Sequence, residues 1–335
     1  MRQSPVYTHL ITGGAGFIGS NIAATLLKNG ERVRILDNFS SGKKENLIFA
    51  PEPAGSSLEI IEGDIRDPEI CRRAVRGVDY VIHHAALISV PQSTKNPTLA
   101  NDINITGTLN MLLAARDEGV RRFILASSCA VYGDGTSDVS SLIDETSFAP
   151  VNEAMRPWPL SPYALGKLAG EEYCRIFYEL YGLETIALRY FNVFGPKQDP
   201  ASEYAAVIPK FIIALLSGES PIIFGDGEQT RDFIYVDDVV QANLLACKTS
   251  GAAAGKTFNV ACGRRVSVNA LLNELKSILN INSIPVYKDA RSGDIRHSWA
   301  DITLARKFLG FEPGSSLHDA LSQTANWANK DSRLR

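Results

Sequence analysis

A tyrosine and a lysine with acid/base potential lie four positions apart in the run Ser161-Pro162-Tyr163-Ala164-Leu165-Gly166-Lys167. Side chains four residues apart share one face of a helix, so Lys167 is expected beside Tyr163 on a helix predicted over residues 163–181. A neighbouring ammonium favours the phenolate form of tyrosine. Because free tyrosine titrates near ~10, a base that works at neutral pH needs its pKa lowered by about three units. Taken alone this spacing is common and usually structural, so its interpretation depends on the rest of the chain.

A glycine-rich turn follows the first predicted strand, in Thr12-Gly13-Gly14-Ala15-Gly16-Phe17-Ile18-Gly19. Glycines permit a tight turn and a close approach of the backbone to a pyrophosphate, whose charge meets the free N–H groups at the start of the next helix. A second strand, predicted over residues 32–37, ends at Asp37, 18 residues beyond Gly19 and close to the ~20 of dinucleotide-binding folds. We interpret this turn as a dinucleotide site; the alternative is a turn that is tight for packing alone.

Asp37 bears on the choice of dinucleotide. Its carboxylate is expected to accept hydrogen bonds from the adenosine ribose and to repel a 2′-phosphate, which favours NAD over NADP. Lys43 and Lys44 follow soon after, and a solvated loop explains them better than a clamp for a 2′-phosphate. A positive nicotinamide ring would join Lys167 in lowering the pKa of Tyr163.

Polar and small residues mark the ends of further predicted strands, where open α/β sheets bind ligands. Ser128, in the run Ala126-Ser127-Ser128-Cys129-Ala130-Val131-Tyr132-Gly133, is placed to relay a proton near the nicotinamide or, alternatively, to cap the strand end. Asp64 could face the adenine or serve as a turn residue, and Ala85-Ala86 follow the fourth strand. His83 and His84 are interpreted as structural or cofactor-adjacent, and without a matching second pair no metal site is expected.

The elements that must position these residues alternate short β-rich runs with longer amphipathic stretches, which predicts β-α units around a parallel sheet buried on both faces. Helices are expected over residues 104–118 and 163–181. After Gly195 the alternation of β-rich runs and amphipathic stretches becomes less regular, which predicts a smaller second domain. Residues 133–162 contain four prolines and predict an irregular loop. Strands are expected over residues 6–12, 32–37, 58–62, 80–85, 122–127 and 185–190.

The composition bounds the class of protein. The chain has 335 residues, enough for about two domains at roughly 150 residues each. Apolar residues make up 45% and charged residues 21%, and no run approaches the ~20 apolar residues that span a bilayer, which excludes disordered, coiled-coil and membrane-spanning classes.

The 34 basic and 37 acidic residues give a net charge of -3, so neither nucleic acid nor a membrane is expected as a partner and any anion must be held locally. Five cysteines without close pairs predict reduced thiols, and with no apolar leader-like segment after Met1 a cytoplasmic protein is expected.

These motifs, in this order, resemble the extended short-chain dehydrogenase/reductase family and, within it, the UDP-sugar 4-epimerases. The resemblance covers nearly the whole chain. It implies an α/β fold with a Rossmann-like doubly wound parallel sheet and a smaller mixed α/β substrate-binding domain. The implied domains are residues 1–190 plus about 232–260 for NAD, and 191–231 plus about 261–335 for the UDP-sugar. Besides the runs above, it rests on Asp37-Asn38-Phe39-Ser40, Arg189-Tyr190-Phe191-Asn192-Val193-Phe194-Gly195, Arg231-Asp232-Phe233-Ile234-Tyr235-Val236-Asp237-Asp238 and Arg291-Ser292-Gly293-Asp294.

The resemblance also implies the residues of the site. The implied catalytic set is Ser128, Tyr163 and Lys167. Arginines suit the pyrophosphate because they make charge-assisted, often bidentate bonds to phosphate. The residues implied for a tightly bound NAD are Gly13, Gly16, Phe17, Ile18, Gly19, Asp37, Asn38, Ser40, Gly42, Asp64, Ile65, Ala85, Ala86, Asn104, Tyr163, Lys167, Tyr190 and Val193. Those implied for the UDP-sugar are Ser89, Ser128, Asn192, Ala206, Val207, Phe224, Arg231, Arg291, Asp294 and Ser298.

The expected reaction is 4-epimerisation through a transient 4-keto intermediate. Related dehydratases and decarboxylases carry an acidic residue just after the serine position, where this chain has Cys129 and Ala130. In the family the position of Ser298 faces the sugar, and a small residue there leaves room for an N-acetyl group. The stretch between Ser128 and Tyr163 is longer than in most relatives, and its extra residues could reshape selectivity.

The resemblance therefore predicts interconversion of UDP-GlcNAc and UDP-GalNAc, with activity on UDP-Glc and UDP-Gal. One alternative is an epimerase strictly for UDP-Glc and UDP-Gal, and another is an epimerase for UDP-glucuronate, which would need a further cation near C6 of the sugar. A more remote alternative is a non-catalytic NAD-binding regulator. The resemblance also implies a homodimer joined by a four-helix bundle of residues 104–118 and 163–181.

Overall fold

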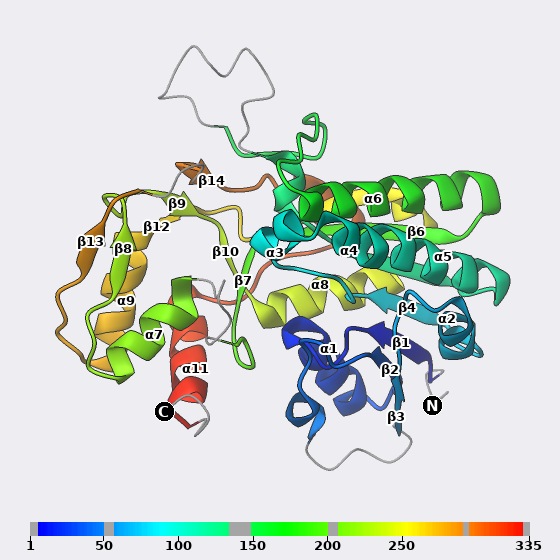
Figure 1. Cartoon of the computed structure of the whole chain (residues 1–335), viewed down its shortest axis with the longest axis horizontal. Helices are drawn as coiled ribbons and strands as arrows, with labels where there is room; N and C mark the ends of the chain where they lie inside the picture. Colours follow the sequence, from blue (N-terminus) through cyan, green and yellow to red (C-terminus); the bar gives the residue numbers. More distant parts are fainter. Residues whose placement is uncertain (1–5, 50–56, 134–148, 200–206, 291–294, 331–335) are drawn as a thin grey trace.

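A seven-stranded parallel sheet forms the centre of the molecule (Figure 1), as the alternation of β-rich and amphipathic runs predicted. The computed structural model describes residues 6–49, 57–133, 149–199, 207–290 and 295–330. The strands lie in the order β3, β2, β1, β4, β5, β6, β11, so the chain reverses direction across the sheet between β1 and β4. Their bounds are β1 Thr8–Thr12, β2 Arg32–Asp37, β3 Ser57–Glu62, β4 Tyr80–His83, β5 Arg122–Ser128, β6 Glu184–Tyr190 and β11 Lys256–Val260.

Two predicted strand ends were wrong by two residues each. Strand β1 begins at Thr8 rather than at residue 6, and β4 ends at His83 rather than at residue 85. The chain leaves the sheet at this point because the amide of Ala85 donates to the side-chain Oγ1 of Thr12 at 3.1 Å. The early end of β4 therefore brings the backbone of Ala85 next to the glycine turn that follows β1.

Helices cover both faces of the sheet because successive side chains of a strand point to opposite sides. Ile11 and Ile124 belong to the buried cluster beneath α1 and α8, whereas their neighbours Leu10 and Leu125 belong to the cluster beneath α2, α5 and α6. The bounds are α1 Phe17–Lys28, α8 Val236–Lys248 and α10 Thr303–Leu309 on the first face, and α2 Pro68–Val75, α5 Thr108–Asp117 and α6 Pro162–Tyr181 on the second.

The helix predicted over residues 104–118 starts earlier than expected. Helix α4 (Pro97–Asn101) continues through a π-helical turn, Asp102–Gly107, into α5, and a short α3 (Val90–Lys95) precedes it. Inside the π turn, the amide of Asn104 accepts from the Leu87 N–H at 2.8 Å and donates to the Leu87 carbonyl at 3.0 Å. π turns often occur at functional sites, and this one depends on a contact to a separate segment.

Shorter elements form a mixed α/β group at the left of Figure 1. Its own core includes Phe194, Phe211, Leu271 and Leu321. Three small sheets join β7 to β10, β12 to β9 to β14, and β13 to β8. The bounds are β7 Asn192–Phe194, β8 Ile222–Phe224, β9 Thr230–Arg231, β10 Phe233–Tyr235, β12 Val266–Ser267, β13 Val286–Lys288, β14 His297–Ser298, α7 Val207–Leu216, α9 Val268–Leu279 and α11 Leu317–Lys330, with 3-10 turns at Lys44–Leu47, Cys129–Tyr132 and Gly251–Ala253.

Part of the irregular loop predicted over residues 133–162 lies outside the described residues, namely 134–148. The described remainder connects two distant segments: the Trp158 N–H donates to the Val131 carbonyl at 2.9 Å, and Val151 forms an isolated β-bridge with Ala300. Among the described residues, no helix combines the length and the apolar character needed to cross a bilayer.

Candidate active site

The glycine turn after β1 leaves no room for side chains. Gly13 has φ +67, and a Cβ there would lie 2.8 Å from the Ala85 backbone nitrogen; a Cβ on Gly19 would lie 2.5 Å from the Gly13 carbonyl oxygen. Helix α1 begins directly behind this turn, with Gly16 in the N-cap position and no acidic residue in its first turn. A bare backbone turn that ends at an uncapped helix N-terminus suits a pyrophosphate, so this part of the structure fits a dinucleotide.

Asp37 stands at the end of β2, next to the same turn. Its Oδ2 accepts from the Ala15 N–H at 2.9 Å and its Oδ1 from the Phe39 N–H at 2.8 Å. Burial raises the pKa of this carboxyl above its ordinary value. A carboxylate has about four acceptor positions, so two backbone bonds orient Asp37 and leave capacity for ribose hydroxyls. A Cβ on Gly42 would lie 2.9 Å from Asp37 Oδ2, so the loop after β2 closes tightly over the carboxylate.

The other polar residues predicted near the adenosine are joined to one another. Asn38 Nδ2 donates to Asp64 Oδ2 at 2.8 Å, and the Ser40 N–H donates to Asn38 Oδ1 at 3.0 Å. Arg66 pairs with Asp64 at 2.8 Å and holds the pKa of that carboxyl at about 2. Asp64 is thus an ionised, turn-forming carboxylate that orients Asn38.

Lys43 and Lys44 are both paired with carboxylates. Lys43 Nζ lies 2.7 Å from Asp199 Oδ2, and Lys44 Nζ lies 3.3 Å from Glu62 Oε2. Both lysines have substantial exposure, as the prediction of a solvated loop expects.

Tyr163 and Lys167 lie on the first turns of α6. Ser161 caps this helix by accepting from the Ala164 N–H at 3.2 Å, and Pro162 occupies the first helical position. The buried Lys167 Nζ lies 5.9 Å from the centre of the Tyr163 ring and donates to the Ala126 carbonyl at 2.7 Å. The lysine is therefore fixed between the tyrosine and the end of β5.

Ser128 ends β5 near this pair. Its side chain lies close enough to Tyr163 to lower the pKa of the phenol, and its hydroxyl accepts from the Ala130 N–H at 3.1 Å, which caps the 3-10 turn that follows. Ser128 is thus placed for both roles predicted from the sequence, as a proton relay and as a cap of the strand end. Tyr163 is held from a second side, because the Ser93 Oγ on α3 accepts from its backbone N–H at 3.2 Å. Nothing in the polar run around Ser93 pointed to this role.

Burial moves the pKa values of the pair in opposite directions. It raises the pKa of Tyr163 to about 12 and lowers that of Lys167 to about 8. The chain's own groups therefore do not lower the tyrosine pKa as expected from the pairing with Lys167, because removal of the phenol from water outweighs the opposing effect of Ser128. The positive ring of an oxidised nicotinamide would add a charge that lowers this pKa.

Three residues predicted for the UDP-sugar lie on two small neighbouring sheets. Ser298 of β14 lies opposite Arg231 of β9 in one sheet, and Asn192 of β7, in the sheet with β10, donates through Nδ2 to the Asp232 carbonyl at 3.1 Å. Arg231 and Asp232 both act electrostatically on the Cys129 thiol, whose pKa burial raises to about 11. The segment with Arg231 therefore approaches the residue directly after Ser128.

Asp232 is a structural anchor that the sequence did not reveal. Its carboxylate accepts from the N–H groups of Cys262 and Gly263, each at 2.9 Å, and of Ala300 at 3.3 Å. Burial raises its pKa to about 6. Asp232 thus fixes the segment just after Ser298.

The remaining predicted site residues divide into three groups. Ser89 caps α3 by accepting from the Gln92 N–H at 3.2 Å, and Tyr190 donates through its hydroxyl to Asn243 Oδ1 at 3.0 Å. Phe17 and Ile18 begin α1, Val207 begins α7 and Phe224 ends β8. Ile65 follows β3, Ala85 and Ala86 follow β4, Val193 lies within β7, and Asn104 lies within the π turn. Ala206, Arg291 and Asp294 lie outside the described residues.

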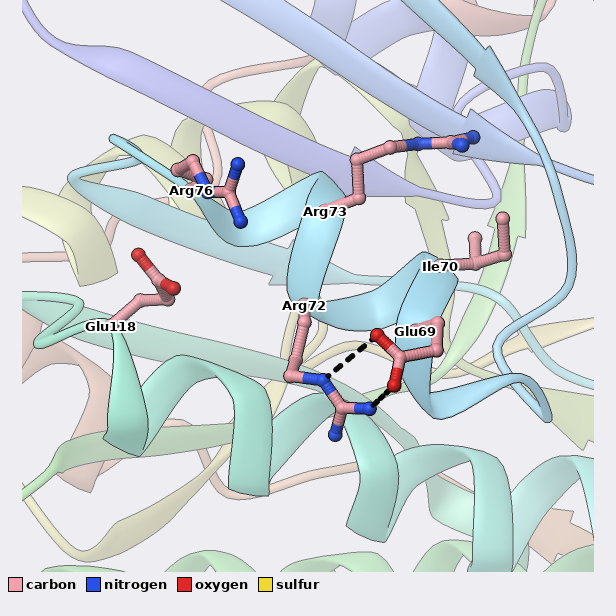
Figure 2. A pocket seen from close by; sticks show the side chains of 6 residues that line it. All are labelled: Glu69, Ile70, Arg72, Arg73, Arg76 and Glu118. Atoms are coloured by element: carbon pink, nitrogen blue, oxygen red, sulfur yellow. Dashed lines mark hydrogen bonds and ion pairs between the residues drawn. The ribbon is translucent and has the colours of Figure 1, made fainter.

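A surface hollow of about 320 Å³ lies elsewhere, on α2 and the end of α5 (Figure 2). It is lined mainly by charged side chains, and Arg72 bonds to Glu69 across it. None of the residues described above contributes to it. Its lining is Glu69, Ile70, Arg72, Arg73, Arg76 and Glu118.

Comparisons with known proteins agree with this geometry. Residues 9–261 match the model of the NAD dependent epimerase/dehydratase family. A UDP-N-acetylglucosamine 4-epimerase structure from Methanobrevibacter ruminantium M1 is 41% identical with a TM-score of 0.87, covering 97% of this chain and 98% of that chain. A UDP-glucose 4-epimerase structure from Thermotoga maritima is 40% identical with a TM-score of 0.86, covering 96% and 99%. A putative UDP-glucose 4-epimerase from Methanocaldococcus jannaschii is 39% identical over 326 residues, 97% of this chain and 99% of the relative. The chain belongs to the NAD dependent epimerase/dehydratase family.

Proposed function

We propose that UDP-GlcNAc and UDP-GalNAc are the preferred substrate pair of this NAD-dependent UDP-sugar 4-epimerase, with UDP-Glc and UDP-Gal as a second pair. The observation that carries the choice of sugar is the pairing of Ser298 with Arg231 across β14 and β9. If Arg231 holds the pyrophosphate, Ser298 lies next to it on the side of the sugar. A serine at this place leaves volume that an N-acetyl group fills.

The proposed mechanism assigns one step to each member of the catalytic set. Tyr163 removes the proton of the 4-hydroxyl as C4 becomes a ketone, and returns it when the hydroxyl re-forms. Ser128, whose side chain lies close enough to Tyr163 to affect its pKa, relays this proton to and from the sugar oxygen. Lys167, whose Nζ lies 5.9 Å from the centre of the Tyr163 ring, adds a positive charge that favours the phenolate together with the charge of the oxidised nicotinamide. NAD, which the glycine turn and Asp37 would hold, would supply a reversible acceptor for the hydride of C4, so that the configuration at C4 can invert when the 4-keto sugar presents its other face.

The two groups of elements hold the two ligands in this proposal. Residues 1–190 with about 232–260 hold NAD, and residues 191–231 with about 261–335 hold the UDP-sugar. The cofactor contacts come from the glycine turn and Asp37, and the substrate contacts come from Arg231 and Ser298 together with Arg291 and Asp294. Because the reaction causes no net oxidation of the sugar, NAD would be unchanged by a turnover and is expected to stay tightly bound.

The substrate preference is tested by incubating the purified protein separately with UDP-GlcNAc, UDP-Glc and UDP-glucuronate, and separating the products at equilibrium. We expect the C4 epimer from the first two, with the higher kcat/KM for UDP-GlcNAc. A protein that epimerises UDP-glucuronate faster than either contradicts the proposed preference. A protein that turns over none of the three while retaining NAD supports the non-catalytic alternative.

Substituting Ser298→Tyr is expected to lower kcat/KM for UDP-GlcNAc relative to UDP-Glc by about tenfold or more, because a bulky group in a fitted pocket costs ~1–3 kcal/mol. The matched control is Ser298→Ala, which keeps the volume and is expected to preserve the ratio within about twofold. Equal kcat/KM ratios for the Tyr variant and the wild type would show that position 298 does not select the sugar.

The protein is also proposed to form a homodimer through α5 and α6. Helix α6 exposes apolar surface at Leu165, Tyr178, Leu180 and Tyr181, which are 37–69% exposed. Large exposed apolar patches mark interaction sites. Size-exclusion chromatography with light scattering is expected to give about twice the 36.5 kDa of one chain, and Leu180→Glu is expected to weaken the association. A wild-type monomer at micromolar concentration contradicts this proposal.

A further inference from the structure

A buried ion pair lies directly behind the proposed acid/base centre. Arg189 Nη2 lies 2.6 Å from Glu171 Oε2, and its Nε donates to Glu171 Oε1 at 2.9 Å. The two side chains are 5% and 4% exposed. The desolvation of a buried ion pair offsets most of its Coulomb attraction, so it contributes little net stability compared with apolar residues. The pair is therefore expected to act mainly on the position and charge of the side chains in the acid/base centre.

The pair joins the three elements that carry the proposed catalytic set. Arg189 of β6 and Ser127 of β5 lie opposite each other in register, and the Ser127 hydroxyl donates to Glu171 Oε1. Glu171 stands one helical turn after Lys167 on α6, so the same helix turn contacts both strands. Ser128 follows Ser127 directly. One carboxylate thus fixes the distance between the helix that carries Lys167 and the strand end that carries Ser128.

Glu171 is also the negative charge that faces Lys167. Around the lysine, α6 contributes Tyr163 and Glu171, and the end of β4 contributes the two histidines at positions 83 and 84. Arg189 of β6 is linked to the lysine through its bonds to Glu171. Both histidines have pKa values lowered to about 3 by burial, so they are neutral near neutral pH. Burial lowers the pKa of Lys167 and the carboxylate of Glu171 raises it. The charge of the lysine therefore depends on Glu171. Arg189, which is bonded to that carboxylate, carries the same charge as the lysine and is expected to oppose its effect.

We propose that Glu171 and Arg189 are positioning residues of the epimerisation reaction, Glu171 keeping Lys167 charged and aligned with Ser128, and Arg189 orienting and balancing the carboxylate. This inference rests on the proposed function, because it assigns a task to Lys167 in that reaction. Neither residue contacts the reacting sugar in this role. Both act through Lys167 and through the end of β5.

The pair can be tested because its two members shift the pH dependence in opposite directions. In Glu171→Gln the lysine keeps only the repulsion of Arg189, so the alkaline limb of the kcat profile moves to lower pH by about half a unit or more. In Arg189→Met the repulsion between the arginine and Lys167 is removed, and the attraction of Glu171 stays. The pKa of Lys167 is therefore expected to rise, and the alkaline limb moves to higher pH by about half a unit. A purely structural role would lower kcat in both variants without moving the limb.

The control is Glu172→Gln on the same helix, which breaks an exposed pair with Arg175 at 3.0 Å and is expected to leave the profile unchanged. NAD content and melting temperature establish that each variant is folded, and one folded member of the pair suffices because its direction of shift is specified. Limbs that stay within about 0.2 pH units of the wild type, or that move in the same direction, overturn the inference. A wild-type protein without epimerase turnover overturns the proposed function instead.

Discussion

Replacing Tyr163 by phenylalanine is expected to lower kcat by about 10³-fold, within the ~10²–10⁴-fold that a positioned acid/base group contributes. The ring and its neighbours remain, so only the proton-transfer oxygen is lost. Because the Tyr163 side chain is only partly exposed, bulk water does not easily replace it as a base. The measurement is kcat with the preferred UDP-sugar, together with NAD content and melting temperature.

The matched control for this substitution is Tyr178→Phe, which removes a phenol hydroxyl from the same helix at a side chain that is 37% exposed. We expect its kcat to stay within about twofold of the wild type, as for most surface substitutions. A Tyr163→Phe protein that keeps most of the wild-type kcat would show that another group handles the proton of the 4-hydroxyl.

Substituting Gly19→Ala is expected to remove bound NAD and to lower activity by about 10²-fold or more, since a ~1 Å misplacement of reacting groups costs about that much. The new Cβ would lie 2.5 Å from the Gly13 carbonyl oxygen and 2.9 Å from the Gly14 Cα. Both neighbours are backbone atoms of the turn, so the whole turn must shift. The measurement is the amount of NAD released per chain when the purified protein is denatured.

Gly314→Ala provides the comparison, because a Cβ there meets no atom closer than 4.0 Å and the backbone is not left-handed. It is expected to keep the wild-type content of NAD and the wild-type activity. If Gly19→Ala also kept a full complement of NAD, the close packing of this turn would not be what holds the cofactor.

The central sheet was largely predictable from the sequence because buried parallel strands appear as short β-rich runs between amphipathic helices. Strand β2 was predicted to the residue, at 32–37, and helix α6 to within one residue at its start. The glycine turn, and Asp37 at the sequence distance typical of dinucleotide-binding folds, predicted which part of the candidate site would bind the cofactor. Both are local patterns, which is why the sequence shows them.

The parts that escaped prediction depend on contacts between distant segments. The π turn before α5 is held by Asn104 against Leu87, and the segment after Ser298 is held by the carboxylate of Asp232. The buried pair of Glu171 and Arg189 joins positions 18 apart on different elements. No periodicity or spacing rule reports such contacts, so the elements of the site were predictable but the bonds that align them were not.

The central claim is that C4 of the sugar loses and regains the same hydride while Tyr163 moves only the proton of the hydroxyl. The most direct measurement uses a UDP-sugar with deuterium at C4, first UDP-GlcNAc and then UDP-Glc, converted to equilibrium and analysed by NMR and mass spectrometry. The account predicts that the epimeric product carries the deuterium at C4, and that unlabelled substrate in heavy water gains none on carbon. Loss of the label from C4, or incorporation of solvent deuterium there, would contradict it.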